Sequence, residues 1–182
     1  FMAGASELEI AAAYLRGCDC SENEMPYGII AGVNEHAAVL HHHNLDKQRP
    51  TPRSFLIDAG VAMNGYASDI SRTYAYDSGS DFAALIAAMD VAQLDLVASG
   101  GIGKSPVDLH VLSHLKIAEI LRQFDVLNVS AEEAFANDIT GTFYPHGLGH
   151  HLGCNVHDKG ANLANAQGDL LPAPEKYPKL RS

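Results

Sequence analysis

The sequence predicts an α+β fold, with strands and helices in separate stretches of the chain. Short apolar runs interrupted by turn residues occupy residues 27–40 and 55–76, which predicts two β-hairpin regions. Two long helical patterns follow at residues 81–99 and 105–124. With 182 residues, the chain is long enough for one domain with its own core.

The N-terminal region predicts a helix followed by a hairpin. Ser6-Glu7-Leu8-Glu9 is a capping box that opens a helix running through Leu15 and ending at Gly17. Apolar runs at 27–31 and 37–40, separated by Gly32-Val33-Asn34-Glu35, indicate two short strands. The second run leads into three consecutive histidines, so one of these rings could face a site at the end of a strand.

The next region predicts a second hairpin with a carboxylate on each arm. Asp58 ends an apolar run, and Asn64-Gly65 is a strong two-residue turn signal. Folding about this turn brings Asp58 and Asp69 toward each other. Two facing carboxylates repel unless a cation or a shared proton lies between them. Taken singly, each aspartate is better explained as a turn or capping residue.

The helical region is expected to be structural. The first long helix ends at the glycines of 100–103, which lack the spacing of a phosphate-binding loop. Ser105-Pro106 supplies the N-cap and the first residue of the second long helix. Its His110 and His114 could share a face, but without a third ligand nearby they are expected to be surface histidines. A short third helix starts at Ser130, and the proline-rich tail after residue 158 is expected to be irregular.

Residues 145–158 hold four histidines within twelve residues, interleaved with glycines. Histidine is the commonest metal ligand, and glycine lets the backbone approach whatever the rings surround. Polar and apolar residues alternate from His151 to His157, which predicts a strand. A histidine-rich surface loop or an adventitious metal binder explains this segment, taken alone, equally well.

Composition excludes some partners. The formal charge of −10 argues against nucleic acid, because phosphate binding needs a basic face. No uninterrupted apolar run approaches the length of a membrane span, and no signal peptide is visible, so no membrane partner is expected. The cysteine count is odd, with Cys18, Cys20 and Cys154, which is typical of reduced thiols in the cytoplasm. A zinc site at Cys18 and Cys20 lacks a second pair.

The order of these motifs resembles a known family. Asp58, Asp69 eleven residues later and His-Gly-Leu-Gly-His at 146–150 are similar to the Xaa-Pro dipeptidase (prolidase) branch of the pita-bread metallopeptidases, and nearly as similar to the related organophosphorus acid anhydrolases. The resemblance runs over essentially the whole chain. It implies a curved antiparallel sheet covered by helices. It also implies hydrolysis of Xaa-Pro dipeptides by a hydroxide held between two divalent metal ions, most often manganese, with cobalt or zinc as alternatives.

The resemblance also assigns roles to residues. It implies that the metal ligands are Asp58, Asp69 and His150. It implies that the active-site histidines are His146, His157 and His41. The residues implied on the substrate side are His41, Tyr27 and Arg181.

The family completes its metal site with two glutamates that follow the position of Arg181, and it has a further domain ahead of Ala3. Residues 1–182 are therefore expected to be a partial catalytic domain. The full-length protein is expected to be a cytoplasmic homodimer acting on a dipeptide with a C-terminal proline. Two alternatives are organophosphorus ester hydrolysis at the same site and a non-catalytic pita-bread binding module. The second conflicts with the retention of each ligand position that the chain reaches.

We predict that the 182-residue chain by itself binds at most one divalent ion at this metal site, weakly, and does not cleave dipeptides. Asp58, Asp69 and His150 supply too little negative charge to offset the mutual repulsion of two dications. Manganese titration and an Xaa-Pro cleavage assay on the isolated chain measure both. Two tightly bound manganese ions together with the full-length rate of cleavage would contradict it.

Overall fold

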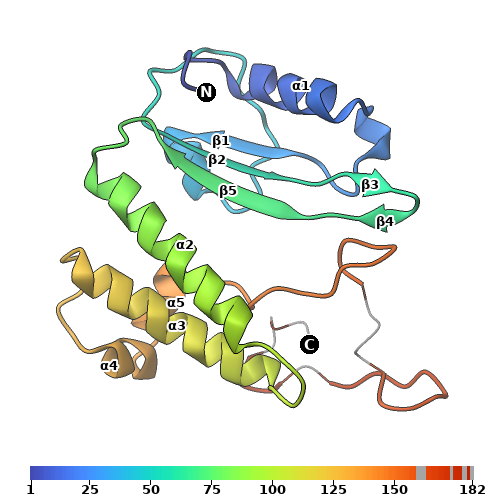
Figure 1. Cartoon of the computed structure of the whole chain (residues 1–182), viewed down its shortest axis with the longest axis vertical. Coiled ribbons are helices and arrows are strands. Elements are labelled where there is room, and N and C mark those ends of the chain that lie inside the picture. The colour runs from blue at the N-terminus through green and yellow to red at the C-terminus, as the bar shows by residue number, and fades with distance from the viewer. Residues whose placement is uncertain (159–162, 173, 178–179, 181–182) are drawn as a thin grey trace. The chain divides into compact units, whose positions relative to one another are not determined.

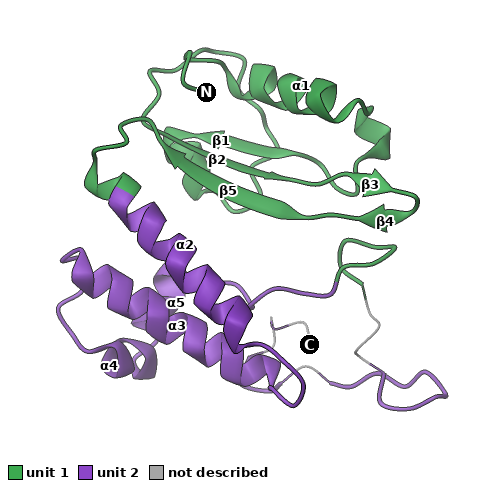
Figure 2. Ribbon diagram, in the orientation of Figure 1, with its two compact units in different colours: residues 1–83, 152–158 green, residues 84–151, 159–182 purple. Residues whose placement is uncertain are grey.

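The computed structural model describes residues 1–158, 163–172, 174–177 and 180. The chain forms two compact units (Figure 2), the first of residues 1–83 with 152–158, and the second of residues 84–151 with 159–182. The first unit holds the strands and the second holds most of the helical residues, so the predicted α+β class is confirmed.

A three-stranded antiparallel sheet with β2 in the middle organises the first unit (Figure 1). Its strands are β1 (Ile30–Val33), β2 (Ser54–Ala59) and β5 (Ile70–Ala75). Between β2 and β5 the chain forms a two-stranded ribbon of β3 (Ala62–Met63) and β4 (Tyr66–Ala67). The predicted second hairpin is therefore correct, although the arm expected at 66–76 is divided into β4 and β5.

The predicted first helix is α1 (Glu7–Cys18), and it packs against β1. Its capping box is formed, since Ser6 Oγ accepts from the Glu9 N–H and Glu9 accepts from the Ser6 N–H. The helix continues past Gly17 to Cys18, and its C-cap residue Asp19 has a left-handed backbone. A short 3-10 helix, η1 (Glu22–Glu24), follows. The core beneath consists of Ala31, Val33 and Phe55, packed with Phe1, Ile10, Ile29, Leu45 and Ile57.

The predicted hairpin at 27–40 is wrong. Only β1 forms a strand, and the second run becomes part of a 3-10 helix, η2 (Asn34–Ala38). Asn34 adopts a left-handed backbone, and its side chain bonds the backbone of Thr51 and Arg53. The chain then folds back over Gly32, where an added Cβ would lie 2.7 Å from the His36 carbonyl oxygen. As a result, the histidines at 41–43 lie in a loop and not at the end of a strand.

The Glu7 carboxylate joins α1 to the loops beside the sheet. It is 2 % exposed and accepts the backbone N–H groups of Val33 at 2.9 Å and Asp46 at 2.8 Å. His36 Nδ1 lies 2.9 Å and His42 Nε2 2.8 Å from its two oxygens. Burial raises the pKa of Glu7, but these four hydrogen bonds outweigh burial and lower it to about 2. The group therefore stays ionised inside the protein.

The second unit confirms the predicted helices. It contains most of α2 (Asp81–Ser99), followed by α3 (Pro106–Gln123), α4 (Ala131–Ala136) and α5 (Ile139–Phe143). Ser105 caps α3 by accepting from the Val107 N–H. The helices α3, α4 and α5 pack together around a core of Ala118, Ala131 and Ala134. Lys116 of α3 forms an ion pair with Asp95 of α2 at 3.2 Å.

His110 and His114 are not surface histidines, which corrects the prediction for α3. They are 4 % and 6 % exposed, and their rings contact each other edge to face with centroids 4.6 Å apart. His114 Nδ1 forms a hydrogen bond with Thr140 Oγ1 at 2.8 Å, and its ring lies 4.9 Å from that of Tyr144. Both histidines share a helix face, as their spacing allowed, but that face packs against the α5 region.

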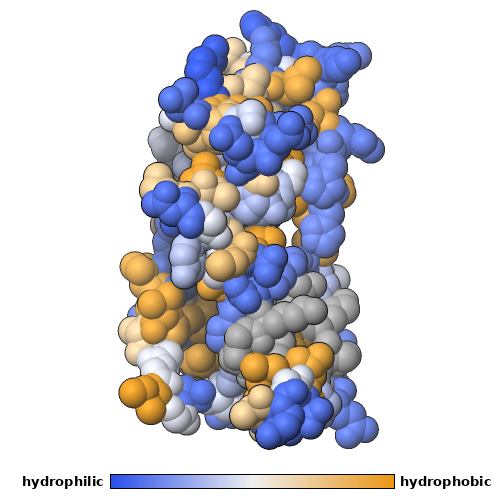
Figure 3. Space-filling model, turned by 90° about the vertical axis from the view of Figure 1, so that its right-hand side faces the viewer, coloured by the Kyte–Doolittle hydropathy of each residue, from blue (hydrophilic) through white to orange (hydrophobic). Residues whose placement is uncertain are grey.

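The helix α2 is apolar and largely exposed. Among the described helices it alone is long and apolar enough to cross a membrane, and 6 % of its most apolar window is buried. It carries Asp90 and Asp95, and a single such helix is weak evidence for a membrane span. The absence of a membrane partner therefore stays a prediction. Apolar side chains are exposed among polar ones on the face in Figure 3, and α2 exposes Val91, Leu94 and Val97.

No strand forms in residues 145–158, so the strand predicted from their alternation is wrong. Gly149 has a φ of 65°, which breaks the extended conformation. A strand also needs a ladder of backbone bonds to a neighbour; in the described part of the chain Ala67 donates to the Gly153 carbonyl at 2.8 Å, while the Gly153 N–H turns back to the Asn155 carbonyl at 3.2 Å. The described residues of the tail are irregular, as predicted, apart from an isolated bridge between Leu163 and Leu170.

We predict that Glu7→Gln lowers the free energy of unfolding by about 2–4 kcal/mol, because an amide cannot accept from all four donors. The pKa of Glu7 falls from its ordinary 4.5 to about 2, so its contribution is complete above about 4.5 and is lost as the pH falls toward about 2. The variant should therefore lose part of the rise of stability with pH in that window.

Chemical denaturation at a series of pH values measures both effects. Glu22→Gln, on the exposed helix η1, is the matched control and should change the free energy of unfolding by less than about 0.5 kcal/mol. Equal effects of the two substitutions would contradict a stabilising role for the buried carboxylate.

Candidate metal centre

The ribbon of β3 and β4 brings Asp58 and Asp69 together, as predicted. Asn64 and Gly65 have φ values of 52° and 84°, which a two-residue turn of this twist requires. Ala62 pairs with Ala67 and Met63 with Tyr66. The chain then returns to the main sheet, where Asp58 of β2 lies opposite Ser71 of β5.

A tight neck between the ribbon and the main sheet sets the position of the two carboxylates. A Cβ on Gly60 would lie 1.8 Å from the Ser68 carbonyl oxygen, so only glycine fits. The Val61 N–H donates to Ser68 Oγ, and the Ser68 N–H donates to the Val61 carbonyl, each at 2.9 Å. Asp58 lies two residues before Gly60, and Asp69 directly follows Ser68.

The Tyr27 hydroxyl lies 2.7 Å from Asp58 Oδ1 and 2.7 Å from Asp69 Oδ1. A phenol has one proton to donate, so it cannot fully satisfy both carboxylates at once. The remaining close oxygen–oxygen contact requires a further proton or a cation. The role of Tyr27 as a link between the two aspartates was not predicted, since nothing local in the sequence places it there.

The pKa values of this group reflect the same conflict. Burial raises the pKa of Asp58, the Tyr27 hydroxyl lowers it, and the charge of Asp69 raises it again, so that it lies above its ordinary value. Burial and the two neighbouring carboxylates also raise the pKa of Tyr27, which keeps its proton at neutral pH. The pair therefore holds unfavourable negative charge that a bound cation would neutralise.

His157 belongs to the same unit and lies near Asp69. A ring nitrogen of His157 and a carboxylate oxygen of Asp69 lie within 4.8 Å of each other. The segment is attached by the bond from Ala67 to the Gly153 carbonyl. It turns tightly at Gly153, where a Cβ would lie 2.0 Å from Asp158 Oδ2. The first unit thus brings together Tyr27, Asp58, Asp69 and His157.

His146 and His150 belong to the second unit. His150 Nδ1 lies 3.0 Å from the His151 carbonyl oxygen. His146 lines a cavity of about 480 Å³ whose walls carry the rings of His110, His114, Phe135, Tyr144 and Tyr177. Within the described part of the chain His110 Nδ1 is buried without a hydrogen-bond partner. Burial lowers the pKa of His110, and burial together with His110 lowers that of His114, so both rings are neutral.

Two candidate residues lie elsewhere. His41 is exposed in the loop between η2 and β2, next to the buried His42. Arg181 lies outside the described residues. The roles of His41, Arg181, Tyr27 and the other site residues in substrate binding and catalysis stay predictions.

Comparison with known proteins identifies the family. Residues 1–176 match the model of metallopeptidase family M24. The chain belongs to this family. It is 50% identical over 182 residues to the Xaa-Pro dipeptidase of Xanthomonas oryzae pv. oryzae, and 47% identical to that of Pseudoalteromonas translucida. Each alignment covers all of this chain and 41% of the relative, so the chain spans less than half the length of these dipeptidases.

Solved structures of aminopeptidase P share the fold. The aminopeptidase PepP of Pseudomonas aeruginosa matches with a TM-score of 0.77 at 26% identity, over 92% of this chain and 39% of that chain. Zinc-substituted Escherichia coli aminopeptidase P in complex with product matches with a TM-score of 0.72 at 23% identity, with the same coverage, which shows the fold alone. The predicted pita-bread fold is confirmed.

The residues of the first unit fit the divalent metals that the M24 family implies. Carboxylate oxygen and imidazole nitrogen suit divalent transition metals. The Tyr27 hydroxyl reaches both Asp58 and Asp69, and the tight turn at Gly60 holds the two carboxylates close. Their oxygens and negative charge suit a metal centre, and the imidazole of His157 lies near Asp69.

We predict that Gly60→Ala weakens manganese binding at least about tenfold, or about 1.4 kcal/mol. The added methyl would displace the Ser68 backbone and separate Asp58 from Asp69. Manganese titration followed by electron paramagnetic resonance measures the affinity. Gly17→Ala is the matched control, because nothing lies within 4 Å of its added Cβ in α1. Equal affinity in both variants would mean that the neck does not set the carboxylate positions.

We also predict that Asp58→Asn raises the melting temperature of the metal-free chain at neutral pH. The pKa of Asp58 is raised, so its ionised form is penalised above that pKa, and the penalty disappears as the pH falls below the ordinary value of 3.8. The gain should therefore be present at neutral pH and absent in acid. Asp90→Asn, on the exposed part of α2, controls for the change in net charge. A lower melting temperature for Asp58→Asn at neutral pH would contradict the penalty.

Proposed function

We propose that the whole protein is a metal-dependent dipeptidase that hydrolyses Xaa-Pro dipeptides. The observation that carries this proposal is the meeting of Asp58 and Asp69 at the Tyr27 hydroxyl, at 2.7 Å from each. It is supported by 47–50% identity over the whole chain to proteins named Xaa-Pro dipeptidase.

The proposed cofactor is a pair of divalent ions, with manganese as the first choice. Asp58, Asp69 and His150 would hold them, together with two glutamates supplied outside residues 1–182. When bound, such ions supply Lewis acidity and lower the pKa of a water molecule. The conflict of charge at Asp58, Asp69 and Tyr27 supports cation binding here.

The residues of the chain would bind substrate and move protons. Tyr27 orients both carboxylates through its hydroxyl. Hydrolysis adds water across the carbonyl–nitrogen bond, and the departing proline nitrogen must gain a proton. His157 beside Asp69 and His146 at the edge of the ring-lined cavity are the proposed donors. Arg181 and His41 are proposed on the substrate side.

Other properties of the whole protein are proposed on narrower grounds. Cys18, Cys20 and Cys154 are free thiols, which favours the cytoplasm. The net charge of −10 disfavours nucleic acid as a partner. A homodimer is proposed from the resemblance of the chain to the family.

The proposal is tested on the full-length protein with manganese and an Xaa-Pro dipeptide. We predict that Asp69→Asn combined with His150→Ala reduces cleavage to the detection limit, because both substitutions remove metal ligands. Asp90→Asn, on the exposed surface of α2, should retain full activity. Survival of activity in the double variant would refute the assignment.

Comparing kcat/KM for the dipeptide with that for a fluorophosphonate decides between dipeptidase and organophosphorus hydrolase. The absence of manganese and cobalt binding by calorimetry would favour a non-catalytic module.

A further inference from the structure

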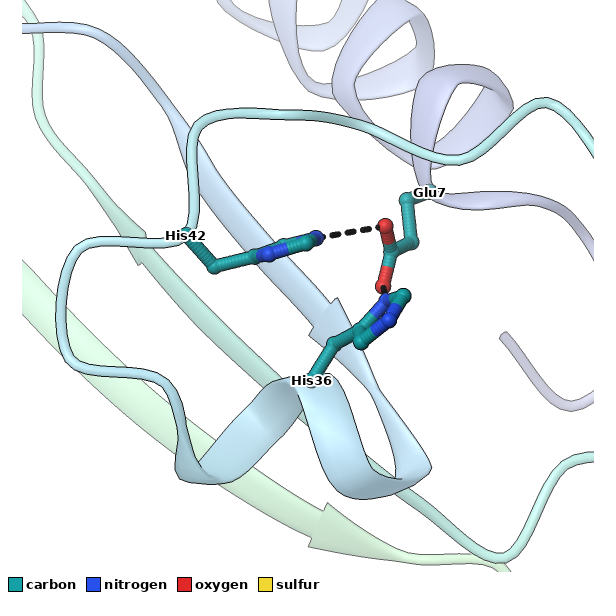
Figure 4. Close-up of side chains that lie close together, drawn as sticks. All are labelled: Glu7, His36 and His42. Atoms are coloured by element: carbon teal, nitrogen blue, oxygen red, sulfur yellow. Dashed lines mark hydrogen bonds and ion pairs between the residues drawn. The ribbon is translucent and has the colours of Figure 1, made fainter.

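We propose that Glu7, His36 and His42 form a second metal site, which takes a borderline first-row divalent cation such as Zn²⁺. One carboxylate oxygen and one nitrogen from each ring all lie within 4.8 Å of one another. Figure 4 shows the two rings converging on the Glu7 carboxylate. None of these residues belongs to the Asp58 and Asp69 centre, so the inference does not rest on the proposed function.

The geometry is close to that of a coordination sphere. His36 Nδ1 lies 2.9 Å from Glu7 Oε1, and His42 Nε2 lies 2.8 Å from Glu7 Oε2. Ligands about 2.0–2.2 Å from a tetrahedral zinc ion lie roughly 3.3 Å from one another. The two rings contact different oxygens, so a single ion would draw both rings toward one oxygen, within a set of donor atoms that already lie within 4.8 Å of one another. Each imidazole proton would move to the other nitrogen of its ring, which frees the nitrogen facing Glu7 as a ligand.

The surroundings of Glu7 resemble the outer shell of a metal site. The backbone N–H groups of Val33 and Asp46 each donate to one of its oxygens, at 2.9 and 2.8 Å. They can keep these bonds when a cation is bound, and they hold the carboxylate oriented and ionised. The pKa of about 2 for Glu7 agrees with a permanently charged ligand. Hydrogen bonds of this kind keep a metal-binding carboxylate pointed at the ion.

The donor types select the class of cation. Two imidazoles and one carboxylate suit zinc, nickel, cobalt or copper, whereas calcium and magnesium prefer oxygen ligands alone. The Glu7 and His42 side chains are 2 % and 10 % exposed, while that of His36 is 40 % exposed. The His36 side therefore provides an entry route and room for a water ligand.

A bound cation would connect three segments that are distant in sequence. Glu7 is at the start of α1, His36 is in η2, and His42 is in the loop that follows. A cation that binds the folded chain stabilises it in proportion to its free concentration. It would also restrain the loop carrying His41, next to His42.

The test uses the chain with Asp58→Asn and Asp69→Asn, which removes both carboxylates of the Asp58 and Asp69 centre. Zinc affinity is measured by competition with a chromophoric chelator, and Cu²⁺ electron paramagnetic resonance counts the nitrogen ligands. We predict one bound zinc ion and two coordinating nitrogens. Adding His36→Gln should weaken zinc binding at least about tenfold and remove one nitrogen.

His43→Gln is the matched control, because His43 is an exposed histidine in the same loop. The chain has ten histidines, so the decisive quantity is the difference between His36→Gln and His43→Gln. His36 is partly exposed, so its substitution should leave the fold intact, which circular dichroism verifies. Equal zinc affinity in the two variants, or no zinc binding at all, would show that the three residues are a hydrogen-bonded group only. Neither measurement depends on dipeptidase activity.

Discussion

The Glu7 carboxylate is the interaction on which the first unit depends. Burying an ionised carboxylate is costly unless hydrogen bonds replace its water. Here four donors from outside α1 do so, and they come from the end of β1, η2 and the loop before β2. The start of α1, the edge of the sheet and the loop that carries His41 are thereby fixed to one another. The apolar core around Ala31, Val33 and Phe55 is small, which makes this polar connection more important.

The electrostatic surroundings of Asp58 and Asp69 differ from those of Glu7. Four donors lower the pKa of Glu7, whereas burial and the charge of Asp69 leave the pKa of Asp58 raised, although the Tyr27 hydroxyl reaches both aspartates. The tight neck at Gly60 and Ser68 prevents the carboxylates from separating to relieve their repulsion. Holding the two negative charges close lowers the stability of the folded chain, and such an arrangement is expected of a cation-binding active site.

Local signals made part of this structure predictable. The turn at Asn64-Gly65 specifies its own backbone, so the meeting of Asp58 and Asp69 followed from sequence. The hairpin expected at 27–40 failed because Asn34 bonds to residues 17 and 19 positions away. His110 and His114 were misplaced because burial depends on α5 packing across them. The bonds to Glu7 span 26 to 39 residues, and no sequence spacing signals such a set.

The two carboxylate groups also differ in what a cation would do. At Asp58 and Asp69 a cation would offset the burial and the repulsion that raise the pKa of Asp58, so binding there removes a penalty. At Glu7 a cation would only take the place of two imidazole N–H donors, whose protons move to the other ring nitrogens, because the carboxylate is already satisfied. Metal binding at Glu7 therefore depends on the free concentration of metal alone, whereas binding at Asp58 and Asp69 is also favoured by the relief of repulsion. The balance of burial, hydrogen bonds and neighbouring charge thus differs between the two places: it lowers the pKa of Glu7 and raises that of Asp58, so a cation relieves a penalty only at Asp58.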